Sequence, residues 1–129
     1  ALVLDKGSEK WRNNELEAFT STPVCREGRV YSTIKTGELL CVDADTGEVF
    51  WRLKLAPDQV HASPTWADGK LYVPMFDGKV FVVKAGDEFS VVAENELDDT
   101  CLASPALAGG MLFFRTRFKL IAIGTKGGK

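Results

Sequence analysis

A repeat of 41 residues constrains the fold of this chain more than any other feature of its sequence. Prolines stand at positions 23, 64 and 105, glycines at 28, 69 and 110, and aromatic residues at 31, 72 and 113. Neighbouring members of each set are therefore 41 residues apart. When several residue classes share one spacing, the chain consists of stacked copies of one supersecondary unit.

Each copy is expected to contain four short strands. The first runs from the proline to the glycine turn, and the second covers 29–35, 70–76 or 111–117. The third strand, 39–42, 80–83 or 120–123, is almost entirely apolar, which predicts a strand buried on both faces. The fourth strand covers 48–55 or 89–94. Pro74 removes a ladder hydrogen bond from a second strand, so a β-bulge is expected there.

Four strands in a period of about 40 residues match the blade of a β-propeller. The predicted fold class is therefore all-β, with propeller blades of four antiparallel strands. About three blades are present, which makes the propeller incomplete. The expected divisions are a partial blade over 1–14, whole blades over 15–55 and 56–98, a three-stranded partial blade over 99–124, and a tail over 125–129.

The stretch Cys41-Val-Asp-Ala-Asp-Thr-Gly-Glu-Val-Phe-Trp51 resembles the tryptophan-docking motif of pyrroloquinoline-quinone-like, or quinoprotein-dehydrogenase-like, repeat proteins. This resemblance implies that Trp51 packs between adjacent blades, and that Asp43 and Thr46 fix the turn containing Gly47. A shortened copy near the N-terminus contains Asp5, Gly7 and Trp11. In the third copy the repeat spacing places Val92 at the tryptophan position, where docking is expected to be weaker or absent.

Within this family, the chain looks closer to the outer-membrane-protein assembly lipoprotein and similar binding propellers than to the dehydrogenases. The resemblance implies a non-catalytic binding or scaffold protein in the periplasm or another extracytoplasmic compartment. The alternative is part of a quinone-dependent dehydrogenase. The binding role implies no cofactor. We also expect no metal, because one histidine and scattered cysteines form no recognisable zinc motif. The net charge of −2 argues against nucleic acid, and the short apolar runs argue against a membrane span.

Four residues are candidates for contacts at the rim or in the central channel. His61 precedes a first strand and either makes a local hydrogen bond or contacts a ligand. Trp66 lies on a first strand, where it either packs or stacks on a cofactor. Arg115 and Arg117 alternate with Lys119 along one strand face, and they form either a solvated hairpin end or a basic partner-binding rim.

Cysteine number and blade number both bear on assembly. Cys25, Cys41 and Cys101 have no CxxC spacing, so buried free thiols are expected, with a single disulfide as the alternative.

Three blades cannot close a ring. We therefore expect the chain to be a C-terminal part or fragment of a longer propeller, or a part-propeller that associates with other copies of itself. The isolated chain is not expected to be a stable monomer.

Overall fold

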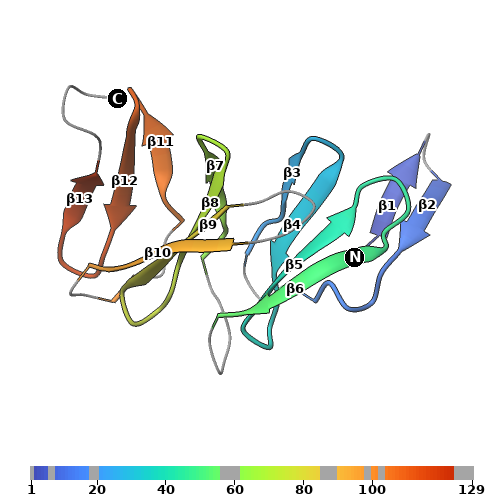
Figure 1. Ribbon diagram of the computed structural model, residues 1–129, viewed down its shortest axis with the longest axis horizontal. Helices are drawn as coiled ribbons and strands as arrows, with labels where there is room; N and C mark the ends of the chain where they lie inside the picture. The colour runs from blue at the N-terminus through green and yellow to red at the C-terminus, as the bar shows by residue number, and fades with distance from the viewer. Residues whose placement is uncertain are drawn as a thin grey trace.

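The computed structural model describes residues 2–5, 8–17, 21–55, 62–84, 90–97, 100–101 and 104–123. All the regular structure in these residues is β-strand, arranged in four antiparallel sheets (Figure 1). The predicted fold class, an incomplete propeller of antiparallel blades, is confirmed. None of these residues belongs to a helix long and apolar enough to cross a membrane.

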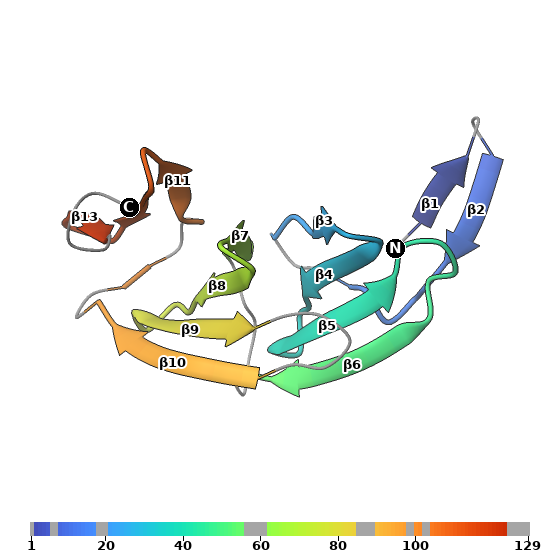
Figure 2. The ribbon, with the colours of Figure 1, turned by 45° about the horizontal axis from the view of Figure 1, so that its top comes forward.

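The four sheets follow one another in chain order (Figure 2). The N-terminal sheet contains β1 (Leu2–Asp5) and β2 (Ser8–Arg12). The second sheet contains β3 (Val24–Arg26), β4 (Arg29–Thr33), β5 (Glu38–Asp43) and β6 (Val49–Lys54). The third sheet contains β7 (Thr65–Ala67), β8 (Lys70–Pro74), β9 (Lys79–Lys84) and β10 (Ser90–Glu96). The C-terminal sheet contains β11 (Ala106–Ala108), β12 (Met111–Arg115) and β13 (Leu120–Ile123).

The glycine of each repeat closes the hairpin between the first two strands of its sheet. Both central residues have positive φ in all three hairpins, for example 52° at Glu27 and 76° at Gly28. This is the type I′ geometry, whose twist matches that of the flanking strands. A glycine at the second position avoids the steric penalty that a side chain would bring there.

The hydrophobic core lies in the seams between sheets. One cluster joins Tyr31 and Leu39 of the second sheet to Leu71 and Val73 of the third. Another joins Ala67 and Val80 of the third sheet to Leu112 and Phe114 of the C-terminal sheet. A third joins Trp11 of the N-terminal sheet to Leu40 and Val42 of the second. Each sheet is therefore stabilised mainly by its neighbours, as in other repeat proteins.

Two expectations about the strands are wrong. The third strand is buried in β5 but not in β13, where Leu120 is 71% exposed and Ile123 is 43% exposed. The reason is that no described sheet covers the outer face of β13. No bulge accompanies Pro74, which is the last residue of β8 and pairs with Val80 in regular register. The ladder between β7 and β8 ends at Tyr72, so Pro74 lies beyond it.

The position of the core in the seams predicts a large effect of substituting one phenylalanine of the C-terminal sheet region and a small effect of substituting another. Phe114 is 1% exposed, whereas Phe118 is 78% exposed. We expect Phe114→Ala to lower the free energy of unfolding of the intact protein by about 3–5 kcal/mol, because it leaves a cavity in the seam. Phe118→Ala is the matched control and should change it by about 0.5 kcal/mol or less. Equal losses in urea titrations would contradict this placement of the core.

Candidate functional site

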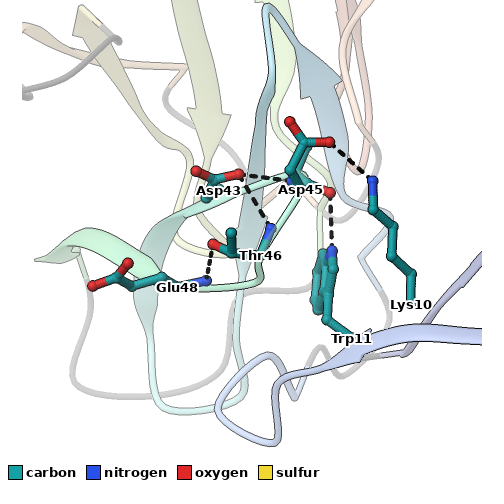
Figure 3. A network of polar contacts seen from close by, with 7 residues as sticks. Lys10, Trp11, Asp43, Asp45, Thr46 and Glu48 are labelled. Carbon is teal, nitrogen blue, oxygen red and sulfur yellow. Dashed lines mark hydrogen bonds and ion pairs between the residues drawn. The ribbon is translucent and has the colours of Figure 1, made fainter.

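The turn between β5 and β6 is closed by its own side chains (Figure 3). Asp43 Oδ1 accepts hydrogen bonds from the backbone N–H groups of Asp45, at 2.7 Å, and Thr46, at 3.2 Å. The Thr46 hydroxyl accepts one from the N–H of Glu48 at 3.3 Å, and the Gly47 N–H donates to the Asp43 carbonyl at 2.8 Å. Aspartate and threonine often stabilise turns in this way.

The tryptophan of the preceding sheet lies on this turn. Trp11 is buried, and its Nε1 donates a hydrogen bond to the Ala44 carbonyl at 2.9 Å (Figure 3). A Cβ atom built on Gly47 would meet Trp11 Cε3 at 2.5 Å, which shows how closely the indole ring approaches the glycine. Two polar contacts flank the ring: Asn13 Nδ2 donates to the Gly47 carbonyl at 2.7 Å, and Lys10 Nζ pairs with Asp45 at 2.9 Å.

Trp51 lies on the fourth strand of the second sheet and packs in the seam with the third sheet. It is buried in the cluster that contains Leu71 and Val73, and its ring centroid is 5.9 Å from that of Tyr31. Among the other members of the predicted motif, Asp5 ends β1 and pairs with Ser8. Gly7 lies outside the described residues.

The tryptophan position of the third sheet is occupied by Ala93, and the assignment of Val92 to it is wrong. Cys41 pairs with Trp51, whereas the repeat equivalent of Cys41, Val82, pairs with Ala93. The segment from Val82 to its partner is one residue longer than the segment from Cys41 to its partner, and Val92 falls at a register shift. Alanine is too small to dock as an indole does.

A second row of contacts, which was not predicted from the sequence, joins the sheets beside their first strands. The Thr22 N–H donates to Ser63 Oγ at 2.7 Å, and the Ser63 N–H donates to Ser104 Oγ at 2.7 Å. Each pair is separated by one repeat of 41 residues. The signal was present in the sequence, since a hydroxyl residue precedes the proline of every copy.

The candidate rim and channel residues occupy different kinds of position. Trp66 is half-buried and stacks on Tyr31 with centroids 5.8 Å apart, while the Arg26 guanidinium lies 5.8 Å from its ring. Arg115 and Arg117 are exposed, and the Arg117 guanidinium lies 5.0 Å from the Phe118 ring. His61 lies outside the described residues. No group of three potential metal ligands occurs among the residues that the structure describes.

The three cysteines are free, two of them buried and one exposed. The expectation of buried free thiols is therefore correct for Cys41 and Cys101 and wrong for Cys25. Burial raises the pKa of Cys41 to about 11 and that of the neighbouring Tyr31 to about 12. Both groups are neutral at physiological pH, since desolvation disfavours the thiolate and the phenolate.

The family model described as outer membrane protein assembly factor BamB matches residues 1–129. The chain belongs to this family. A search of curated proteins gave no match. Among solved structures, BamB from Moraxella catarrhalis aligns over 95% of this chain and 42% of its own length, with a TM-score of 0.66 and 15% identity.

Two quinohemoprotein alcohol dehydrogenases share the fold with this BamB-family chain. ADHIIG from Pseudomonas putida HK5 aligns over 93% of the chain with a TM-score of 0.70 and 18% identity. The enzyme from Comamonas testosteroni aligns over 77% with a TM-score of 0.65 and 19% identity. The chain spans only 21% and 17% of these two proteins. At such identities the likeness extends to the fold and no further.

The contact between Trp11 and Gly47 predicts a large effect of adding one methyl group. Gly47 has a φ of +77° and Gly69 a φ of +71°, but nothing lies within 4 Å of a Cβ at Gly69. Gly69→Ala should therefore cost only the left-handed backbone penalty, about 1–2 kcal/mol. Gly47→Ala should cost a further 1–3 kcal/mol or so, because the methyl group collides with the indole ring.

A double-mutant cycle separates the two causes of the Gly47→Ala effect. In a Trp11→Ala background the collision is gone, so Gly47→Ala should cost no more than Gly69→Ala. Urea unfolding of the four variants measures each term. An unchanged cost of Gly47→Ala in that background would contradict the docking geometry.

The burial of two thiols predicts selective labelling. Ellman's reagent should react rapidly with one thiol per native chain, at Cys25, and with three after denaturation. The raised pKa of Cys41 leaves little of the reactive thiolate at pH 8. Cys25→Ser should abolish the rapid phase. Rapid labelling of all three thiols in the native protein would contradict the packing of the seams.

Proposed function

We propose that this chain is part of a non-catalytic binding or scaffold propeller, which holds a protein or other ligand at its rim. The main support for the proposal is that the side chains of the docking motif form their contacts within the protein. Asp43 and Thr46 hydrogen-bond to their own turn, and Trp11 hydrogen-bonds to that turn from the preceding sheet. These side chains hold the blades together, so we assign recognition of the partner to residues at the rim. Membership of the BamB family supports the same role.

The first partner that we propose is a further blade against the C-terminal sheet. The positions equivalent to Ile123 are Cys41 and Val82, both of which are buried, and Cys41 packs in a cluster with Leu71 and Val73 of the following sheet. A neighbour that covered β13 would bury Leu120 and Ile123 in the same way. Such a blade can come from the remainder of a longer chain or from another copy of this one.

Because the chain belongs to the BamB family, we also propose a periplasmic or other extracytoplasmic location.

A quinone-dependent dehydrogenase is the second candidate, because two such enzymes share the fold. It requires an aromatic side chain that stacks on the cofactor, and Trp66 is the first-strand candidate. Its ring already contacts Tyr31 and Arg26 of the second sheet. Those contacts favour packing in the seam over cofactor binding.

A cofactor titration distinguishes the two candidate functions. The intact protein is mixed with calcium and pyrroloquinoline quinone, freed of unbound quinone, and examined by absorption spectroscopy. A binding propeller should retain no stoichiometric quinone and should not oxidise alcohols with an artificial electron acceptor. Stoichiometric retention with alcohol oxidation would overturn the proposal. A known quinoprotein reconstituted in parallel is the positive control.

The binding role also predicts a stable partner in the cell. Affinity purification of the intact protein after cross-linking in vivo should yield a discrete heteromeric adduct that mass spectrometry identifies. If cross-linkers of several lengths join the protein only to other copies of itself, a role in binding another molecule is contradicted.

A further inference from the structure

The repeat distinguishes exposed positions that a following blade would cover from positions that stay exposed at the rim. Leu120 and Ile123 are exposed only in the C-terminal sheet, since their equivalents in earlier copies are half-buried or buried. Arg117 and Phe118 differ from them. Their equivalents, Lys35 with Thr36 and Phe76 with Asp77, are exposed although a sheet follows each copy. Arg117 and Phe118 therefore belong to the true rim.

Three of these rim residues form an amphipathic surface, which we call the aromatic rim: Phe76, Arg117 and Phe118. Phe118 is 78% exposed with the Arg117 guanidinium 5.0 Å from its ring, and Phe76 is 53% exposed. The two hairpin ends are joined through residues 100–101: the Arg117 N–H donates to the Thr100 carbonyl at 2.8 Å, and the Cys101 N–H donates to the Phe76 carbonyl at 3.1 Å. Both hairpin ends lie at the lower edge of Figure 1.

Two exposed cations, Arg117 and Lys119, lie at the aromatic rim, near the exposed carboxylates of Asp77, Glu94 and Glu96. Arg117 and Lys119 are exposed, and neither forms an ion pair with another residue in the described part of the chain. The carboxylate of Asp77, beside Phe76, lies 4.0 Å from Lys79, whose ammonium group also lies 3.8 Å from Glu94. A guanidinium stacked on an aromatic ring keeps its edge free for a carboxylate while the ring offers apolar area.

We propose that the aromatic rim docks an acidic segment of a partner protein, with an apolar side chain of that segment against Phe76 and Phe118 and a carboxylate on Arg117. This inference rests on the proposed binding function. An anionic lipid surface fits less well, because a broad negatively charged face would meet Asp77 and Glu94 as well as Arg117, whereas one peptide carboxylate can bind Arg117 alone. The exposed area of the two phenylalanine rings is small, on the scale of a peptide contact. Aromatic and arginine side chains commonly dominate such interfaces.

Fluorescence anisotropy with a model peptide tests the proposal. The probe is a short fluorescein-labelled peptide that alternates Asp and Glu with Phe and Leu, added to the intact protein at low salt. We expect Phe118→Ala and Arg117→Glu each to weaken binding by about tenfold or more, the loss typical of a hot-spot residue. Binding should also weaken as salt rises. Phe118 is exposed, so its substitution should leave the fold intact, which unfolding curves verify.

Phe50→Ala is the matched control variant. Phe50 is 45% exposed and has the Arg29 guanidinium 5.5 Å from its ring, but it lies on β6, away from the aromatic rim in the chain. It should bind the probe as the unmodified protein does. A peptide with lysine in place of the acidic residues, and one with alanine in place of Phe and Leu, should both bind poorly.

Three results would overturn the proposal. The first is no binding of the acidic probe, or binding that the rim substitutions leave unchanged. The second is equal binding of the lysine peptide. The third is a loss of co-sedimentation with phosphatidylglycerol vesicles in the rim variants while peptide binding stays the same, which would assign the surface to a membrane. Each of these leaves the partner found by cross-linking intact, whereas failure of that cross-linking removes the binding role itself.

Discussion

The close approach of the Trp11 indole ring to Gly47 joins two sheets that could not be stable alone. The glycine satisfies two requirements at once, a φ of +77° and the absence of a Cβ beneath the ring. Two hydrogen bonds, from the indole and from Asn13, hold the contact in register. Because both faces of the inner strands are apolar, each sheet needs a neighbour, and every other part of the structure depends on such seams.

The seams use different side chains for the same purpose. The second seam buries Trp51 with Tyr31, and Trp66 covers the tyrosine from the third sheet. The third seam has Ala93 where a tryptophan would dock, and it relies on Phe114 and its neighbours instead. A serine hydroxyl that accepts a hydrogen bond from a backbone N–H group is common to the seams on both sides of the third sheet. Although the side chains in the seams differ, the order of the strands within each sheet does not, since the backbone hydrogen bonds of each sheet form independently of the seams.

The sequence predicted the sheets and turns well because a period and a glycine are local signals. The glycine turns and the buried β5 were visible in the repeat, and the docking motif was predicted from the family resemblance. A fixed spacing could not detect the extra residue that moves Ala93 into the place expected for Val92. Burial depends on neighbours, so the exposure of β13 and of Cys25 could not be predicted from apolar runs or residue type. The stacking of Arg117 on Phe118 needs coordinates, because spacing does not determine side-chain direction.

Hydrogen exchange followed by mass spectrometry tests most directly the claim that stability resides in the seams. In the intact protein, Trp51→Ala removes the indole ring from the seam between the second and third sheets. We expect faster amide exchange in β4, β5, β8 and β9, which border that seam, and unchanged exchange in β11 to β13. Faster exchange confined to β6, or spread evenly over all the sheets, would contradict that claim.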